Sequence, residues 1–408
     1  MEFDKLINNC LKCKKPLCKT KCPSNIDIPL VVNEIENGNI DNALNIILEK
    51  HSIPFICGAL CDQNKQCGAG CIKHLDFMKD VETKLGDYFL SEDQYFKVAK
   101  NNKNNINIAI IGGGVAGVSC AYEFLKAGYS VTIFDREDSL GGIVKYYLPS
   151  FRYDNNKMIN FIERLISMGL KIEYNKTFGK NLLIADLNDF KYIVLAMGTT
   201  KYVNVLPKDE HVKSAFDILY KYQNNCDLNL YNNKNILVLG GGNVAYDVAR
   251  CLKRLDANVK IIYRRDIKNS PASIKEINLA IDEGIIIEEL KSPIELIYEN
   301  EKFIGVKFEK MELIDTGELR KNFKGLNEFE VIKCDYVVEA LGSKCDYNYL
   351  KTIKPELFNE SNYIEDDYYL NENRIFVCGD YLTGAATFSS ASHSGVLTSK
   401  IIIDKEDK

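Results

Sequence analysis

The cysteines of this chain are concentrated near its start, in a pattern that could hold metal. Of the fourteen cysteines in 408 residues, eight occur within the first 71 residues and six are scattered singly. The concentrated eight are Cys10, Cys13, Cys18, Cys22, Cys57, Cys61, Cys67 and Cys71. In a reducing compartment, clustered thiols are metal ligands more often than disulfides. Because soft thiolate sulfur suits both iron and zinc, these residues predict a metal-binding part of the chain.

The first four cysteines lie in the run CLKCKKPLCKTKCP, residues 10–23, which is similar to the ferredoxin signature. In that signature three cysteines hold one cluster, and the cysteine before proline, here Cys22, ligates a second cluster. The remaining ligands of the second cluster must therefore come from the later cysteines. The alternative is two structural zinc sites, which usually contain two Cys-x2-Cys pairs each. Only one such pair, Cys10 and Cys13, is present, and this favours iron–sulfur clusters over zinc.

A glycine-rich turn indicates a second kind of chemistry. It lies in INIAIIGGGVAGVSCAYEFLKAGYSVTIFD, residues 106–135, between a strand-like and a helix-like stretch. Gly112, Gly114 and Gly117 allow a tight turn that brings a pyrophosphate close to the N-terminus of the helix. Asp135 ends the next strand, at the distance where an acid binds a ribose hydroxyl. The stretch therefore predicts a dinucleotide site.

The same pattern returns in NILVLGGGNVAYDVARCLKRLDANVKIIYRRD, residues 235–266, where the turn contains Gly240 and Gly242. At the end of its second strand, Tyr263 stands in place of an acid and two arginines follow, Arg264 and Arg265. An acid would repel a 2′-phosphate, whereas guanidinium groups bind it. This favours NADPH over NADH. The residues that we add to this predicted site are Asn243 and Val244.

Two dinucleotide units in one chain predict a nicotinamide cofactor and a flavin. The order of a cysteine part, two nucleotide parts and the segment VCGDYLTGAATFSSASHSG, residues 377–395, resembles the small subunit of glutamate synthase and the electron-input half of dihydropyrimidine dehydrogenase. The spacing of the later four cysteines resembles the pyrimidine branch. The chain length suits the free-standing flavin subunit of the two-component bacterial dihydropyrimidine dehydrogenase, which the chain resembles most. One departure is Asp62, because the family usually has proline after the cysteine at position 61.

The resemblance implies roles for particular residues. Asp380 would bind the ribityl chain of FAD, and Gly342 would lie near the nicotinamide ribose. The other residues placed at the flavin are Gly142, Arg152, Gly379 and Thr387.

The resemblance also implies how two [4Fe-4S] clusters are held. The predicted ligands of the first cluster are Cys10, Cys13, Cys18 and Cys71. Three cysteines are predicted for the second cluster: Cys22, Cys61 and Cys67. Cys57 would be a spare thiol, Asp87 would supply the fourth ligand of the second cluster, and Glu82 is the next candidate.

These parts predict an enzyme in which hydride from NADPH reduces FAD, and electrons pass through two [4Fe-4S] clusters to a catalytic partner subunit or a ferredoxin-like acceptor. One alternative, a disulfide reductase of the thioredoxin reductase type, needs a close redox pair of cysteines in a nucleotide domain. Cys120 and Cys251 are single. The other alternative is a zinc-stabilised nucleotide-binding scaffold. The four histidines are isolated in sequence, so each, including His51, is expected to be a surface or packing residue.

The fold that must position these groups is α/β. We expect a helical iron–sulfur domain at 1–100, a discontinuous Rossmann-like FAD domain at 101–200 and 336–408, and a Rossmann-like NADPH domain at 201–335. The polar run KNNKNN, residues 100–105, marks the first boundary, and residues 106–408 are expected to fold and bind FAD without the cysteine part.

Charge and termini limit the partners. The formal net charge of −5 comes with interspersed signs, which gives no basic stripe for nucleic acid. The start MEFDKLINNC lacks the features of a signal peptide, and no apolar run is long enough to span a bilayer. We therefore expect a cytoplasmic protein with no membrane or nucleic-acid partner.

Overall fold

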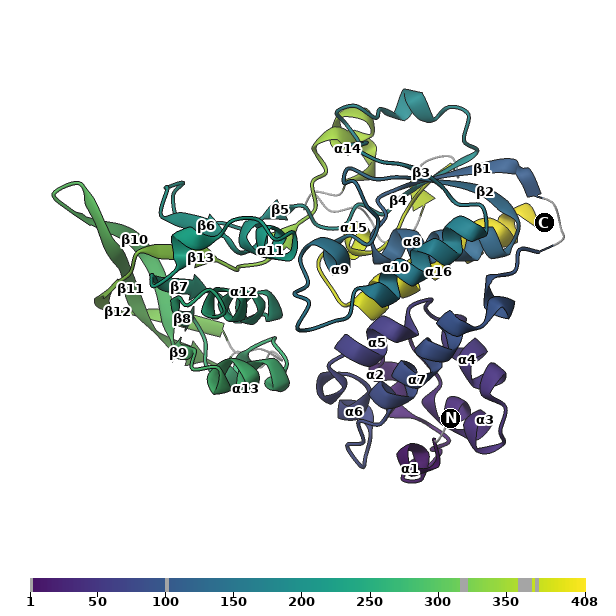
Figure 1. Cartoon of the computed structure of the whole chain (residues 1–408), viewed down its shortest axis with the longest axis horizontal. Coiled ribbons are helices and arrows are strands. Elements are labelled where there is room, and N and C mark those ends of the chain that lie inside the picture. The colour runs from purple at the N-terminus through teal and green to yellow at the C-terminus, as the bar shows by residue number, and fades with distance from the viewer. Residues whose placement is uncertain (1–2, 100–102, 316–321, 359–368, 371–373) are drawn as a thin grey trace. The chain divides into compact units, whose positions relative to one another are not determined.

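The computed structural model describes residues 3–99, 103–315, 322–358, 369–370 and 374–408 (Figure 1). Two compact units make up the chain. The first comprises Met1–Lys145, Phe151–Thr200 and Cys345–Lys408, and the second comprises Tyr146–Ser150 and Lys201–Lys344. The predicted boundary after residue 100 lies outside the described residues.

The cysteine-bearing part of the first unit is helical. Its described α-helices are α1 (Asp4–Ile7), α2 (Leu17–Lys21), α3 (Ile28–Glu36), α4 (Ile40–Leu48), α5 (Pro54–Leu60), α6 (Cys67–Gly70) and α7 (Met78–Ser91). Helices α3 and α4 form a hairpin, in which Asp27 caps α3 by accepting a hydrogen bond from the Leu30 amide. Gly38 turns the chain between them at a φ of +77°.

Helices α5 and α7 pack backbone against backbone. A Cβ atom on Gly86 would lie 2.5 Å from the amide nitrogen of Phe55, and one on Gly58 would lie 2.4 Å from that of Thr83. Only glycine fits at such distances, so these two positions set how closely α7 approaches the second group of cysteines.

A six-stranded sheet in the order β15-β16-β4-β1-β2-β3 forms the rest of the first unit. Its strands are β1 (Lys103–Ile111), β2 (Tyr129–Phe134), β3 (Lys171–Glu173), β4 (Tyr192–Leu195), β15 (Tyr369–Leu370) and β16 (Ile375–Val377). The pairs are parallel except β15 with β16. Because β16 comes from the C-terminal segment, the sheet is discontinuous in sequence, as predicted.

Several helices belong to the same unit as this sheet. They are α8 (Val115–Lys126), α9 (Ile143–Tyr146), α10 (Asn156–Ser167), α14 (Asn348–Ile353), α15 (Asp380–Thr383) and α16 (Phe388–Glu406). Helix α8 packs against α10 and α16 (Figure 1). A Cβ atom on Gly395 of α16 would lie 2.3 Å from the carbonyl oxygen of Ala116, so glycine permits this close contact.

The second unit contains a parallel sheet in the order β6-β13-β7-β8-β9. Its strands are β6 (Val212–Ser214), β7 (Asn235–Leu239), β8 (Asn258–Tyr263), β9 (Ile286–Glu289) and β13 (Tyr336–Glu339), with helices α11 (Ala215–Gln223), α12 (Asn243–Lys253) and α13 (Ile274–Asp282). The domain boundary predicted after residue 335 assigned β13 to the FAD domain. In the structure β13 pairs in register with β7, because its apolar residues complete this second core.

The second unit also has two antiparallel additions. One is the three-stranded sheet of β10 (Lys291–Glu299), β11 (Lys302–Ile314) and β12 (Asn322–Lys333), and the other pairs β5 (Lys201–Tyr202) with β14 (Ser343–Lys344). Together the two units confirm the predicted α/β class, with a helical cysteine part and two Rossmann-like sheets.

The helical part and the first sheet share one core, which revises the expectation that residues 106–408 fold alone. Phe89 of α7 contacts Tyr122 of α8 and Phe161 of α10, with ring centroids 5.7 and 5.9 Å apart. The Tyr122 hydroxyl donates to the carbonyl oxygen of Tyr95 at 2.8 Å. A cut at residues 100–105 would expose these rings to water, so the fragment loses part of its core.

Replacing Phe89 with alanine should therefore destabilise the whole first unit. Phe89 is completely buried, and truncating such a ring costs about 3–5 kcal/mol of unfolding free energy. Chemical denaturation would measure the loss. Phe329→Ala is the matched control, because Phe329 is 51% exposed and should change stability by less than about 1 kcal/mol. Equal effects of the two substitutions would contradict the shared core.

Candidate functional site

The first group of cysteines lies where α2 packs against α6, and its members are Cys10, Cys13, Cys18 and Cys71. A Cβ atom on Gly70 would lie 2.6 Å from the Leu17 carbonyl oxygen, so glycine permits this approach. Partial burial raises the pKa of the Cys10 and Cys18 thiols, and the nearby Cys71 raises both further. All four are partly exposed. The structure thus brings together the residues predicted for the first cluster.

The second group is more deeply buried and gathers beside α7; its members are Cys22, Cys57, Cys61 and Cys67. Burial raises the pKa of the Cys22 thiol to about 11, and the neighbouring Glu82 and Cys61 contribute. Burial also raises the pKa of Cys67, again with Glu82 and Cys22 nearby. Cys22 therefore lies near the later cysteines and not with Cys10, Cys13 and Cys18, its neighbours in sequence. Metal that binds these thiols must displace their protons.

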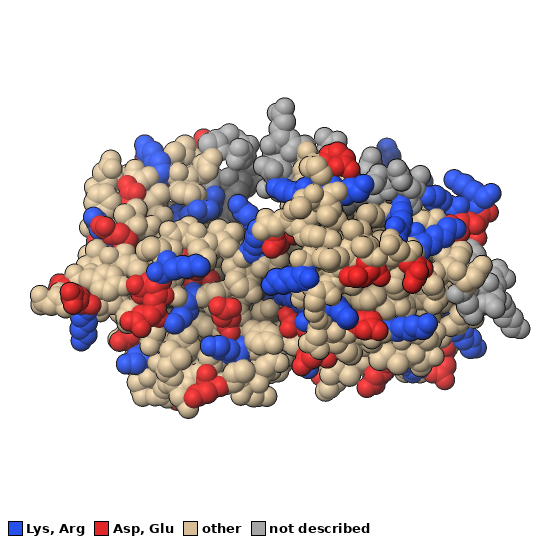
Figure 2. Space-filling model, turned by 90° about the horizontal axis from the view of Figure 1, so that it is seen from above, with Lys and Arg blue, Asp and Glu red and all other residues tan. Residues whose placement is uncertain are grey.

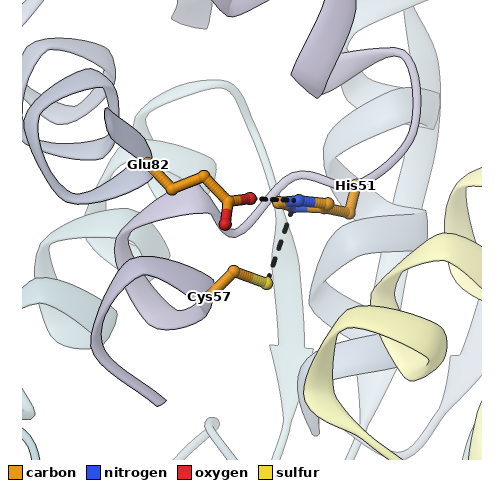
Figure 3. A group of neighbouring side chains, drawn as sticks. All are labelled: His51, Cys57 and Glu82. Carbon is orange, nitrogen blue, oxygen red and sulfur yellow. Dashed lines mark hydrogen bonds and ion pairs between the residues drawn. The ribbon is translucent and has the colours of Figure 1, made fainter. Parts of the chain in front are cut away.

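Glu82 lies among the buried cysteines and is held by His51. Figure 3 shows Glu82 from α7 and Cys57 from α5 both directed toward the His51 ring. The Nε2 atom of His51 is 3.0 Å from a carboxylate oxygen of Glu82, and its Nδ1 atom is 4.0 Å from the Cys57 sulfur. Because the Ile53 amide donates to Nδ1, the proton of the neutral ring is assigned to Nε2, which then donates to Glu82.

The three potential ligand atoms of His51, Cys57 and Glu82 lie within 4.8 Å of one another. His51 is completely buried, and Glu82 is 5% exposed. The sequence prediction treated His51 only as a surface or packing residue, since its partner Glu82 is 31 positions away and no local pattern connects them.

Asp87 does not reach the cysteines. Its side chain is 55% exposed and forms an ion pair with Lys157 of α10. Both acids lie on α7, but five residues on a helix with 3.6 residues per turn place two side chains on different faces. The structure therefore puts Glu82, and not Asp87, beside the second group.

The first glycine-rich turn joins β1 to α8. A Cβ atom on Gly117 would lie 2.0 Å from the carbonyl oxygen of Gly112, which has a φ of +104°. Gly142 approaches the turn so closely that its Cβ atom would lie 2.9 Å from the Gly114 Cα atom. Asp135 follows β2, and one carboxylate oxygen accepts a hydrogen bond of 2.5 Å from the Gly113 amide. Burial raises the pKa of Asp135. These residues form one surface at the end of the sheet.

Gly379 and Asp380 adjoin this turn from the C-terminal segment. Gly379 has a φ of +65°, and a Cβ atom on it would lie 2.6 Å from the Ala116 Cβ atom at the start of α8. One Asp380 carboxylate oxygen is buried without a hydrogen-bond partner among the described residues. Burial raises the pKa of Asp380 to about 6. An unsatisfied buried acceptor here is suited to a ligand that donates hydroxyl groups.

Thr387 and Arg152 have different surroundings. The Thr387 side chain caps α16 by accepting a hydrogen bond of 3.1 Å from the Ser390 amide. Arg152 is half-buried between α9 and α10.

The second glycine-rich turn joins β7 to α12 in the second unit. A Cβ atom on Gly241 would lie 2.4 Å from the Tyr263 ring, so the aromatic ring rests against the turn where the first unit has its acid. The Tyr263 hydroxyl donates to the Asn269 carbonyl oxygen at 3.0 Å. Tyr263 therefore leaves this turn without a carboxylate, which suits a cofactor with an additional phosphate.

The residues flanking this turn are partly accessible. Asn243 begins α12, and its side-chain oxygen accepts a hydrogen bond of 3.1 Å from the Ser273 amide. Val244 follows it, half-buried. Gly342, after β13, is exposed with a φ of +96°, and its carbonyl oxygen accepts from the Val203 amide at 3.0 Å.

The two arginines after Tyr263 differ in exposure. Both guanidinium groups lie over the Phe323 ring, with the guanidinium carbon 4.6 Å from its centroid for Arg264 and 4.7 Å for Arg265. Arg264 is exposed, whereas Arg265 is 8% exposed. Arg264 is thus the arginine better placed to meet a phosphate.

Arg264→Ala is expected to raise the KM for NADPH by about tenfold and leave the KM for NADH unchanged, because only NADPH has a 2′-phosphate to lose contact with. Steady-state kinetics with both nucleotides would measure it. Arg265→Ala is the comparison: it removes a buried stacked group and should lower stability more than it alters this preference. A parallel rise of both KM values in Arg264→Ala would contradict the assignment.

Known protein families match both parts of the chain. Residues 5–94 match the model of dihydropyrimidine dehydrogenase domain II with its 4Fe-4S cluster, and residues 106–395 match that of pyridine nucleotide-disulphide oxidoreductases. The chain belongs to the pyridine nucleotide-disulphide oxidoreductase family. Both turns and the Gly379–Asp380 segment lie within the larger match.

Relatives in this family include oxidoreductase subunits. The β subunit of NADPH-Fe(3+) oxidoreductase from Geobacter sulfurreducens is 29% identical over 351 residues, covering 82% of this chain and 52% of the relative. The chain thus spans about half the length of that relative. The small chain of NADPH glutamate synthase from Escherichia coli K12 is 26% identical over 416 residues, covering 95% of this chain and 88% of the relative.

Among solved structures, Mycobacterium tuberculosis FprA in complex with NADPH has a similar fold. Its TM-score is 0.62 at 18% sequence identity, over 74% of this chain and 85% of that one.

These matches confirm the predicted family, the similarity to the glutamate synthase small subunit, and the assignment as an oxidoreductase of the pyridine-nucleotide type. They also support a 4Fe-4S domain, and so favour the electron-transfer hypothesis over the disulfide reductase and the zinc scaffold. The number of clusters and the individual site residues stay predictions. Among the described helices, none combines the length and the apolar character needed to cross a bilayer.

Proposed function

We propose that the chain oxidises NADPH and delivers the electrons singly to a partner protein, either a catalytic subunit or a ferredoxin-like acceptor. FAD, when bound, would supply the conversion from hydride transfer to single-electron transfer, and the two groups of cysteine-centred ligands would hold two [4Fe-4S] clusters that supply one-electron transfer. The names of relatives as a β subunit and a small chain support a partner subunit. The cytoplasm is the proposed location.

One observation carries this proposal: two separate groups of ligand-type side chains lie in the same compact unit as the FAD-type turn. Cys22 joins the later cysteines although its sequence neighbours join the other group. In a two-cluster domain of the ferredoxin type, the cysteine before proline likewise binds a different cluster from the three cysteines that precede it. The Asp380 oxygen, which has no hydrogen-bond partner in the described part of the chain, and the glycines at the first turn fit a flavin dinucleotide.

We assign the second cluster a ligand set that differs from the sequence prediction. It consists of Cys22, Cys61, Cys67 and Glu82. The position of Glu82 beside these thiols supports it over the exposed Asp87. The His51 N–H group holds the carboxylate in place, and Cys57 stays a spare thiol that contacts His51. The first cluster keeps its four predicted cysteines.

An absorption spectrum with iron and flavin analysis tests the proposed function. Anaerobically purified protein should show flavin peaks on a broad iron–sulfur absorption, and NADPH should bleach both. A protein with flavin but no iron would instead indicate a disulfide reductase. A colourless protein loaded with zinc would indicate the nucleotide-binding scaffold.

A further inference from the structure

Exposed apolar side chains adjoin the first group of cysteines. Of the large apolar residues in the described part of the chain, Ile72 and Leu17 are the two most exposed, at 69% and 60%, and Leu11 is 52% exposed. Each is the immediate neighbour of a cysteine in that group. At the second group, by contrast, the neighbour of Cys57 is Ile56, which is completely buried. Exposed apolar groups that gather at one place indicate a surface for another molecule.

The three side chains belong to one surface. Helix α2 begins at Leu17 and packs against α6, whose Gly70 precedes the cysteine next to Ile72. A Cβ atom on Gly70 would lie 2.6 Å from the Leu17 carbonyl oxygen, so these two segments are in contact. Cys10, the neighbour of Leu11, lies near Cys71, the neighbour of Ile72.

Lysines accompany these apolar residues. Residues 10–23 contain five lysines and no acid, and Lys73 follows Ile72. Two of the lysines are paired, Lys12 with Glu36 and Lys19 with Asp27. The others are exposed and have no ion pair within the described part of the chain: Lys14, Lys15, Lys21 and Lys73. Figure 2 shows a face on which both signs are intermixed, whereas this segment is basic in a chain of net charge −5.

The patch lies by the first group of cysteines, whereas the second group lies toward the flavin-type sheet. The Ser24 hydroxyl, two residues beyond Cys22, donates to the Ser389 carbonyl oxygen at 3.0 Å, and the Ser52 amide donates to the Ser392 hydroxyl at 3.1 Å. Both partners lie on α16, so the second group faces the flavin-type sheet. The first group is the outer one, and the patch adjoins it.

We propose that this basic–apolar patch, formed by Leu11, Leu17, Ile72, Lys14, Lys15, Lys21 and Lys73, docks the electron-accepting protein, and that this acceptor has an acidic surface around its redox centre. The inference rests on the proposed function. Oxidation of one NADPH to NADP+ releases one proton and two electrons, which reduce two acceptor molecules by one electron each. Apolar contact at the centre and complementary charge at the rim suit a transient complex with a fast, salt-sensitive association.

An anionic membrane would also attract lysines, but it accepts no electrons, and the patch adjoins the first group of redox ligands. The acidic protein is therefore the occupant that these observations favour.

Two variants of the complete protein test the patch. The first is Lys14→Glu with Lys15→Glu and Lys21→Glu, and the second is Leu17→Ser with Ile72→Ser. Their matched controls are Lys171→Glu with Lys180→Glu and Lys302→Glu, and Val205→Ser with Ile286→Ser, which alter residues of similar exposure elsewhere. Iron content, flavin content and the EPR spectrum after NADPH reduction should match the wild type in all four.

The probes are two one-electron protein acceptors, rubredoxin with an acidic surface and cytochrome c with a basic one. The lysine variant should lower kcat/KM for rubredoxin about tenfold at low salt, and raising the salt from about 20 to about 300 mM should lower it similarly in the wild type. Reduction of cytochrome c should not fall. The apolar variant should lower the rubredoxin value at every salt concentration, and the controls should stay within about twofold of the wild type.

Unchanged rubredoxin kinetics in both variants, with clusters and flavin intact, would overturn the docking inference alone. The same result together with lysine-dependent binding to phosphatidylserine vesicles would identify the patch as a membrane site instead. A protein without cluster signals, or one that reduces no acceptor with NADPH, would overturn the proposed function itself.

Discussion

Glu82→Ala is expected to remove the cluster assigned to Cys22, Cys61 and Cys67, and to leave the other cluster in place. The reason is positional: Glu82 is the buried carboxylate beside these thiols, and alanine offers iron no ligand atom. Iron content should fall by about half, since two clusters of the same type would become one. Reduction of a protein acceptor should fall far more than the direct reaction of NADPH with the flavin.

Two matched variants are the controls for this experiment. Asp87→Ala removes a carboxylate from the same helix but from an exposed position, and should keep both clusters. Cys57→Ser removes the spare thiol and should also keep both. Iron analysis and low-temperature EPR of the reduced protein distinguish the variants. If Cys57→Ser loses a cluster while Glu82→Ala keeps both, all eight N-terminal cysteines are the ligands and the assignment of Glu82 is wrong.

The second large effect is expected at the flavin site. Asp380→Ala should raise the dissociation constant for FAD by about ten- to a hundredfold, since a hydrogen bond to a charged group contributes about 1.5–3 kcal/mol. The buried oxygen of Asp380 has no other hydrogen-bond partner in the described residues, so its hydrogen bond should be made to FAD and contribute to FAD affinity. Flavin fluorescence during titration would measure the change. Full retention of FAD in this variant would contradict the proposed role.

The raised pKa of Asp380 makes FAD binding depend on pH. Burial raises this pKa from 3.8 to about 6 in the ligand-free protein, so the carboxyl is mostly neutral at pH 5 and mostly ionised at pH 7.5. A ribityl hydroxyl donates more strongly to the ionised form, so FAD affinity should rise as pH rises through 6 and level off above it. Asp380→Asn is the control, because its amide does not titrate. An equal pH dependence in both proteins would assign it to another group.

Several features were predictable from sequence because their chemistry is local. The turn at Gly112–Gly117 must be glycine-rich wherever a strand leads into a helix this tightly, and the second turn repeats the pattern. The arginines after Tyr263 stand next to the position where a ribose acid would be. The discontinuous sheet followed from the resemblance and is confirmed by β16, whereas the placement of β13 required knowledge of its partner β7.

The sequence by itself determined which kinds of groups are present: two dinucleotide turns, enough thiols for two clusters, and a family to which they belong. Only the tertiary structure decided which of them meet. The choice between Glu82 and Asp87 depends on which face of α7 packs against α5, and that face is set by the contacts of Gly58 and Gly86. His51 acquires its partner only when that packing forms. Spacing along a chain specifies local turns, but contacts between residues far apart in sequence arise only when apolar faces are buried together.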